Sequence, residues 1–208
     1  MTLQSNKTLG AVGALLMVIS PFLVSGLTLV VGLVGLILVL IAVKGLSDHY
    51  KEASIFNNSL YGVILSIVGG AVFVAALFVT ALSFFRDVLG IELSAALSDP
   101  TAFSNIDWTE AMIFDNLMAH VAAVVGSLLI LFIFVVVAAI FYRKSLTTLA
   151  EKTGVGLFGT AGLLLLIGAV LTIIAIGFLL IWIALILVTA AFFQIREEPT
   201  QPPPVTPS

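Results

Sequence analysis

The chain has 208 residues, of which 61% are hydrophobic and only 9% are charged, and its net charge is -3. Soluble domains are ~45–50% apolar and ~25% charged, so this composition excludes an ordinary soluble protein. The small net charge gives no reason to expect nucleic acid as a partner. The absence of cysteine excludes disulfides and thiolate metal sites.

Four long stretches contain no Asp, Glu, Lys or Arg: residues 8–43, 53–85, 116–142 and 153–195. A membrane helix needs ~20 apolar residues to cross a hydrocarbon core of ~30 Å. The first and last stretches are therefore too long for one crossing and suit two each. The sequence predicts an all-α, polytopic membrane protein with six transmembrane helices, at about residues 9–24, 27–46, 60–85, 117–142, 156–174 and 177–195.

The first two predicted helices form a tight hairpin, because Pro21, Ser25 and Gly26 supply a break between them. An alternative is a cleaved signal peptide, with Lys7 as its basic region and residues 24–26 as a small-residue cleavage site. The hydrophobic run that follows immediately favours the hairpin.

The first and last hairpins resemble each other when residue n is aligned with residue n+149. The alternative is chance similarity between two leucine-rich hairpins. A true repeat would be parallel, related by a rotation about the membrane normal, and would place the second turn at Ile174 and Ala175. The matched positions are Gly10 with Gly159, Gly13 with Gly162, Leu15 and Leu16 with Leu164 and Leu165, residues 36–39 with 185–188, and Ala42 with Ala191.

The basic residues predict the orientation of the six helices. With six crossings, one side of the membrane carries both termini, and seven of the eight Lys and Arg residues fall there. The positive-inside rule makes that side cytoplasmic and the connection at residues 86–115 external. We therefore expect a multi-pass protein of the plasma membrane with both termini in the cytoplasm. The basic residues on that side are Lys7, Lys44, Lys51, Arg143, Lys144, Lys152 and Arg196, and only Arg86 lies opposite.

The external connection is the most polar part of the chain and is too short for an independent domain. Asp107 followed by Glu110 is typical of a helix start before the membrane is reached. The carboxylates could bind a divalent cation, but their spacing fits no calcium loop, so a solvated acidic surface is expected. They are Asp87, Glu92, Asp99, Asp107, Glu110 and Asp115.

His120 is the one histidine inside the four stretches that lack Asp, Glu, Lys and Arg, and ionisable residues in a membrane are candidates for function. Asn116 lies one helical turn earlier and could hold a ring nitrogen, with Asp115 beside it. His120 also lies in the first turn of its apolar run, at headgroup depth, where an interfacial or packing role is favoured over a proton relay or ligand. Two of the predicted helices also contain small residues at a spacing typical of helix packing. Rows of small residues at four-residue spacing predict close helix packing, at Gly62, Ser66 and Gly70 and at Ala119, Ala123 and Ser127.

The letters Gly154-x-Gly156-x-x-Gly159 match a dinucleotide fingerprint, but they follow no strand, so that chemistry is not expected. We expect one transmembrane helical domain over residues 1–198. A flexible tail follows at residues 199–208, which is rich in proline and should be extended.

Three stretches together resemble a known family. They are residues 5–10, residues 44–62 with Lys44-Gly45-Leu46-Ser47-Asp48 and Tyr61-Gly62, and residues 151–195 with Ala191-Phe192-Phe193-Gln194-Ile195. They are similar to an archaeal multi-pass membrane family known as domain of unknown function 996. The resemblance implies an archaeal cell membrane location. It supplies no substrate, cofactor or catalytic residue.

The sequence favours a non-enzymatic membrane protein with a structural, lipid-binding or partner-interaction role. A catalyst needs a nucleophile, base or metal in a defined arrangement, and the apolar spans offer almost none. We expect no cofactor, no metal and no catalytic residue. The expected partners are membrane lipids, a second copy of the chain or another membrane protein. The alternative is a transporter or channel for an ion or a small solute, for which hydroxyl and backbone contacts would suffice.

Overall fold

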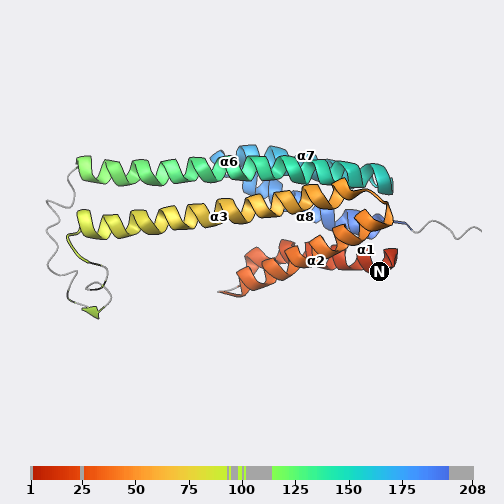
Figure 1. The fold of residues 1–208 in the computed structure, drawn as a ribbon, viewed down its shortest axis with the longest axis horizontal. Coiled ribbons are helices and arrows are strands. Elements are labelled where there is room, and N and C mark those ends of the chain that lie inside the picture. The colour runs from red at the N-terminus through yellow and green to blue at the C-terminus, as the bar shows by residue number, and fades with distance from the viewer. Residues whose placement is uncertain are drawn as a thin grey trace, which may run out of the picture. The chain divides into compact units, whose positions relative to one another are not determined.

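The computed structural model describes residues 2–23, 26–92, 94, 98–99, 101 and 114–196, with side chains from residue 117 in the last range. The tail at residues 199–208 and most of the external connection lie outside them. The regular elements are α-helices and short 3₁₀ turns, ordered along the chain in Figure 1. They are α1 (Leu3–Ile19), η1 (Ser20–Phe22), α2 (Leu27–His49), α3 (Ala53–Asp87), α6 (Phe114–Thr153), α7 (Gly156–Leu171), η3 (Thr172–Ile174) and α8 (Ile176–Gln194).

Among the described residues, α2, α3, α6, α7 and α8 are each long and apolar enough to cross a membrane. Helix α1 is slightly shorter, with 17 residues, and continues into η1. A spanning helix requires ~17–25 residues, so α1 with its 3₁₀ turn also reaches this range. The expected all-α membrane fold is confirmed.

The chain divides into two compact units through which α3 and α6 run continuously. The first contains residues up to Gly62 and from Ala139 onward, and the second contains Val63–Ala138. The single transmembrane domain expected over residues 1–198 stays a prediction.

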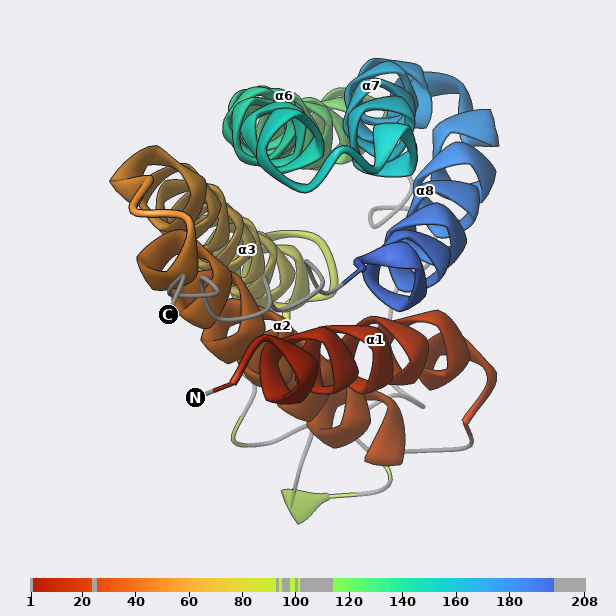
Figure 2. The same cartoon turned by 90° about the vertical axis from the view of Figure 1, so that its right-hand side faces the viewer.

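In the first unit, two helical hairpins pack side by side. Helix α1 packs against α2, α7 packs against α8, and α1 also packs against α8, as Figure 2 shows. Gly13 and Gly35 let the backbones of α1 and α2 approach closely, because a Cβ built on either would lie within 2.7 Å of the other's carbonyl oxygen. The indole N–H of Trp182 in α8 donates to the carbonyl oxygen of Val18 in α1 at 3.0 Å. Close backbone packing therefore holds the first hairpin together, and the Trp182 hydrogen bond joins it to the second hairpin.

The core of the first unit is apolar. Its largest fully buried side chains include Phe158, Phe192, Leu46, Ile55 and Leu149. The rings of Phe158 and Phe192 meet edge to face with centroids 5.1 Å apart. Aromatic pairs in this geometry add ~0.5–1.5 kcal/mol beyond the area they bury.

A buried pair of serines joins α3 to α6 within the first unit. The hydroxyl of Ser145 donates to the carbonyl oxygen of Ile55 at 2.6 Å and lies 2.8 Å from the hydroxyl of Ser59. Since buried polar groups are costly unless paired, this small network satisfies both hydroxyls and fixes the relative position of the two helices.

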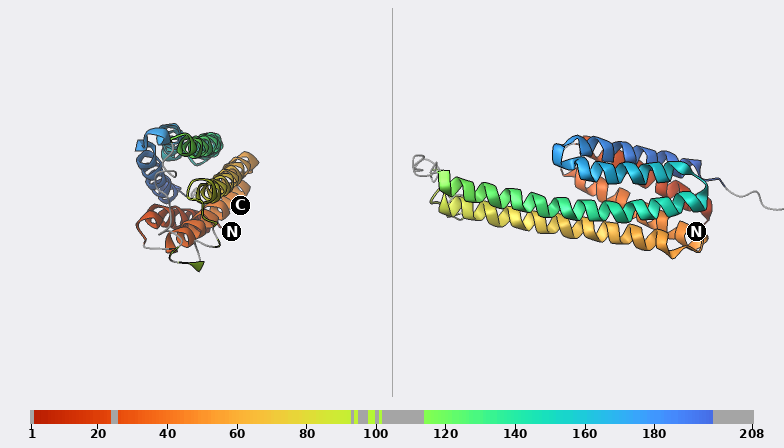
Figure 3. Two further views of the ribbon diagram at one scale, coloured as in Figure 1. Left: turned by 90° about the vertical axis from the view of Figure 1, so that its left-hand side faces the viewer. Right: turned by 90° about the horizontal axis from the view of Figure 1, so that it is seen from above.

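The second unit contains most of α3, from Val63 on, and most of α6, up to Ala138, and these two segments lie side by side in Figure 3. Gly69 faces Phe134, and a Cβ at Gly69 would lie 2.5 Å from the Cβ of Phe134. Close packing in this unit therefore depends on the absence of a side chain at Gly69.

Helices α3 and α6 are longer than predicted. The expected spans at residues 60–85 and 117–142 correspond to Ala53–Asp87 and Phe114–Thr153, so much of the connections predicted at residues 44–59 and 143–155 is helical. At 1.5 Å per residue the 35 and 40 residues extend about 52 and 60 Å, more than a hydrocarbon core of ~30 Å. Hydropathy detects only the apolar part of a helix, whereas the polar ends continue it into water.

The turn of the last hairpin lies where the repeat places it. Residues Thr172–Ile174 form η3, and Ala175 adopts a left-handed conformation with φ 62°. The prediction of a turn at Ile174 and Ala175 is confirmed.

The repeated glycines, however, make different contacts in the two hairpins. Gly13 packs against α2 of its own hairpin, whereas its counterpart Gly162 faces Arg143 and Leu146 of α6. The two hairpins share their sequence register and turn but not their packing partners.

Candidate functional site

His120 lies in the second unit, half-buried, with its ring edge to face against Phe84 at a centroid distance of 5.6 Å. Both residues line an apolar groove of about 530 Å³ between α3 and α6, with Leu77, Val121 and Val124. Asn116 and Asp115 lie in the first turn of α6, but their side chains fall outside the described residues. Their predicted partnership with His120 stays a prediction. What the structure adds is an aromatic packing contact for the histidine.

The described part of the acidic connection is exposed at Asp87, Glu92 and Asp99. Hydrogen bonds from the hydroxyl and the backbone N–H of Thr101 lower the pKa of Asp99. Within the described residues, no three His, Asp or Glu side chains lie close enough together to hold a metal ion. Asp107 and Glu110 lie outside the described residues.

Three hydroxyl groups that could line a transport path donate to carbonyl oxygens of their own helices. Ser20 bonds Met17 at 3.1 Å, Ser127 bonds Val124 at 2.7 Å and Thr172 bonds Ala169 at 2.7 Å. Ser20 and Ser127 are also buried. These bonds satisfy the hydroxyl donors without water, so the hydroxyls can lie in an apolar interior.

Some residues of the two predicted rows of small residues are buried, and others are exposed. Gly62 is buried against Tyr142, and Ser127 is buried in α6. Ser66, Ala119 and Ala123 are exposed in this single chain, and a Cβ at Gly70 would meet nothing within 4 Å. In the second unit the close contact is made one residue earlier, at Gly69. Whether the exposed members face another chain stays a prediction.

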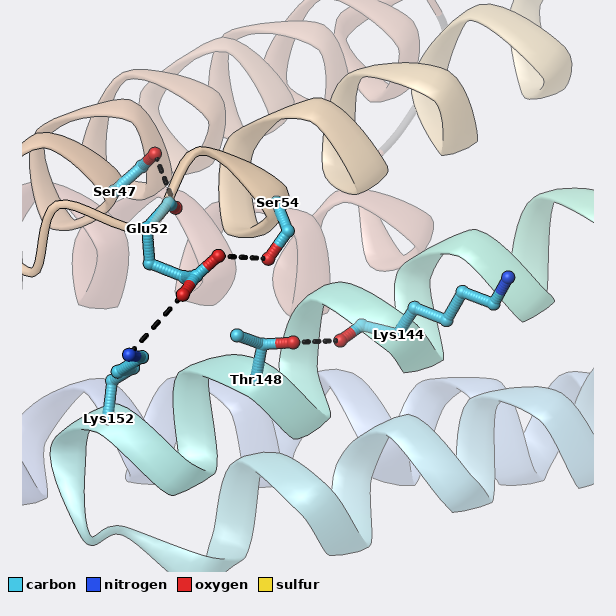
Figure 4. Close-up of polar contacts among 6 residues, drawn as sticks. All are labelled: Ser47, Glu52, Ser54, Lys144, Thr148 and Lys152. Atoms are coloured by element: carbon cyan, nitrogen blue, oxygen red, sulfur yellow. Dashed lines mark hydrogen bonds and ion pairs between the residues drawn. The ribbon is translucent and has the colours of Figure 1, made fainter.

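A polar network lies where the α2–α3 turn meets the C-terminal end of α6, which we call the basic end of the first unit (Figure 4). The Glu52 carboxylate accepts a hydrogen bond from Ser54 at 2.8 Å and pairs with Lys152 of α6 at 3.3 Å. These two contacts, the Ser54 bond first, lower the pKa of Glu52. The hydroxyl of Ser47 donates to the Glu52 backbone oxygen at 2.9 Å, so the network ties the α2–α3 turn to the end of α6. An acidic residue just before a helix is the sequence signal that could have identified it.

A polar pocket of about 920 Å³ lies at the same end of the first unit, between the α6–α7 turn and the end of α8. It includes Gly154 and Gly156 of the glycine fingerprint, and Gly154 has φ 69°. These glycines connect the helices α6 and α7, so they follow no strand, as expected from the sequence. Lys7 lines the pocket and donates to the carbonyl oxygen of Ile195 at 2.9 Å.

Asn6 is a buried polar residue that the sequence did not single out. It is 1% exposed, its Oδ1 has no hydrogen-bond partner among the described atoms, and it packs against Gly45 of α2. Its position in the first turn of α1, beside Lys7, gave no sign of burial. A glycine on the neighbouring helix leaves room for the amide.

Comparison with known proteins gives two matches. Residues 31–186 match a family described as protein of unknown function (DUF996). An uncharacterized protein of Methanocaldococcus jannaschii, MJ1644, is 30% identical over 198 residues, which cover 95% of this chain and 96% of the relative. No solved structure matches.

Proposed function

Because the chain belongs to the DUF996 family, whose function is unknown, we propose that it is a non-catalytic integral membrane protein with a structural or partner-binding role. Its partners would be the surrounding lipids and either a second copy of the chain or another membrane protein. Large apolar side chains exposed on its helices support contact with lipid, among them Leu29, Val74, Phe78 and Phe178.

The observation that carries this proposal is the apolar interior of the first unit. Its buried hydrophobic cluster includes Leu46, Ala161 and Phe192, and the buried hydroxyls of Ser59 and Ser145 bond to each other. The hydroxyls of Ser20, Ser127 and Thr172 lie outside the groove beside α2, the groove at His120 and the pocket at Lys7. A route for an ion or a polar solute needs polar groups along its length, and these three hydroxyls bond to their own helices instead.

Flux across liposomes tests the proposal. Vesicles containing the purified protein should release trapped ions and small neutral solutes at the rate of protein-free vesicles. A pore-forming peptide added to the same vesicles provides the positive control. Saturable flux that increases with the amount of protein would overturn the structural role in favour of transport.

We also propose that the protein lies in the plasma membrane with both termini in the cytoplasm, on the strength of the seven-to-one distribution of basic residues. The chain has no native cysteine, so single cysteines report without background. Ser98→Cys on the external connection should react with a membrane-impermeant thiol reagent in intact cells. Thr147→Cys on the basic end should react only after permeabilisation. Both residues are exposed, so the reversed pattern would reverse the topology.

A further inference from the structure

The C-terminal half of α2 and the start of α3 border an amphipathic groove. The groove has a volume of about 720 Å³, and its apolar part is lined by Ile37, Leu40 and Ile41 of α2 and by Phe56 of α3. Lys44, Asp48 and His49 line the same groove at its other end. The groove therefore changes from apolar to charged along one face of α2.

The groove continues into a polar pocket of about 250 Å³. Lys44, Asp48 and Phe56 line both spaces, and Lys51 and Asn57 are added in the second. Lys44 is the first charged residue after the charge-free stretch of residues 8–43, so it marks the edge of the hydrocarbon. Ile37 lies seven residues earlier in the helix, about 10 Å deeper. The apolar part thus lies at acyl-chain depth and the charged part at headgroup depth.

The charges around the pocket are available to a ligand. Lys44 pairs with Asp48 at 2.7 Å, but both side chains are more than half exposed, and such pairs are weak and easily exchanged. Among the described residues, the ammonium of Lys51 makes no hydrogen bond or ion pair. The second nearby acid, Glu52, is held by Ser54 and Lys152. Lys44 and Lys51 carry two positive charges and Asp48 carries one negative charge. The pocket therefore has a net positive charge even when the exposed His49 is not counted.

The backbone conformation of Lys51 also supports a role for its side chain. Lys51 follows the end of α2 with φ 51°, in the left-handed region that favours glycine at a helix C-terminus. The N–H of the next residue, Glu52, donates to the carbonyl oxygen of Ser47 at 2.9 Å, which closes the helix end. Glycine would form this turn with less strain. A lysine at this position places a cation beside the pocket at a conformational cost.

We propose that this groove binds one membrane phospholipid with an anionic phosphate headgroup. An acyl chain lies along Ile37, Leu40, Ile41 and Phe56, and the phosphate lies between Lys44 and Lys51. Basic pockets between helices at the cytoplasmic surface commonly recognise such headgroups. The site goes beyond the structural role proposed above and does not depend on the absence of transport, so flux in liposomes would leave it intact.

The test compares lipid-dependent thermal stabilisation of the full-length protein in a neutral detergent. Binding to the folded state raises the unfolding temperature, and a tighter ligand does so at a lower concentration. Phosphatidylglycerol should stabilise the wild-type protein at lower concentration than phosphatidylcholine does. Glycerol phosphate, which has the headgroup without the chains, should not stabilise it. Equal stabilisation by glycerol phosphate would overturn the lipid as occupant in favour of free phosphate.

Four variants locate the site. Lys51→Gly relieves the left-handed strain, so it should fold at least as well as the wild type while losing about fivefold in apparent affinity for phosphatidylglycerol. Lys44→Gln should lose a similar factor, and Ile41→Trp should block the chain without changing charge. Lys144→Gln is the control, since it removes an exposed basic residue of α6 that does not line the groove. Wild-type affinity in Lys51→Gly, or an equal loss in Lys144→Gln, would reduce the effect to diffuse surface charge and contradict the site.

Discussion

At the scale of single residues, polarity was readable from the sequence but packing was not. The absence of charge in four stretches predicted the membrane helices, because a charged side chain in hydrocarbon costs several kcal/mol. Which glycine contacts a neighbouring helix depends on the rotation of that helix about its axis. A spacing of four residues does not determine this rotation. The spacing therefore predicts a packing contact at Gly70, whereas the neighbouring Gly69 makes the contact.

The pair Gly69 and Gly70 provides a matched test of this packing. Gly69→Ala should destabilise the protein by about 1–3 kcal/mol, because the new methyl group overlaps Phe134. Gly70→Ala meets open space and should raise stability by up to about 1 kcal/mol through helix propensity. Thermal unfolding of both variants in the same detergent measures the difference. Equal stabilities would mean that the second unit does not pack as described.

At the scale of elements, the sequence placed the helices and one turn but not the helix ends. The start of α3 at Ala53 and the end of α6 at Thr153 lie well outside the apolar runs. The Glu52 carboxylate joins these two ends through Ser54 and Lys152, and both helices continue beyond the apolar residues that hydropathy detects. The turn at Ala175 was predictable only through the repeat, since no proline or glycine lies there.

Ala175 makes the repeat's turn testable. A non-glycine residue at φ 62° is strained, so Ala175→Gly should raise the stability by about 0.5–1 kcal/mol after the entropic cost of glycine. Ala169→Gly is the control inside α7, where glycine should lower the stability by about 1–2 kcal/mol, because the helix loses both propensity and a buried methyl group. Chemical or thermal unfolding separates the two. A loss of stability in Ala175→Gly would show that this residue does not adopt the left-handed conformation.

At the scale of the whole molecule, polar chemistry gathers at the ends of the helices and the middle is apolar. The Glu52 network, the Lys7 contact and the lysines of the α2–α3 turn all lie at the basic end of the first unit. The buried serines Ser59 and Ser145 pair with each other instead of lining a space. This distribution could be inferred from the sequence for charges. It could not be inferred for hydroxyls, whose partners depend on the rotation of each helix.

The central claim is that no water path reaches the buried hydroxyls of the described helices, and thiol chemistry tests it most directly. Thiol reagents of the charged methanethiosulfonate type attack the thiolate, which forms only where water is present. Single cysteines at Ser20 and Ser127 replace two buried hydroxyls that would line such a path, and Ser98→Cys on the exposed connection is the positive control. In reconstituted vesicles we predict rapid reaction at Ser98→Cys and none at the other two positions. Rapid reaction at either buried position would contradict the apolar interior and with it the structural role.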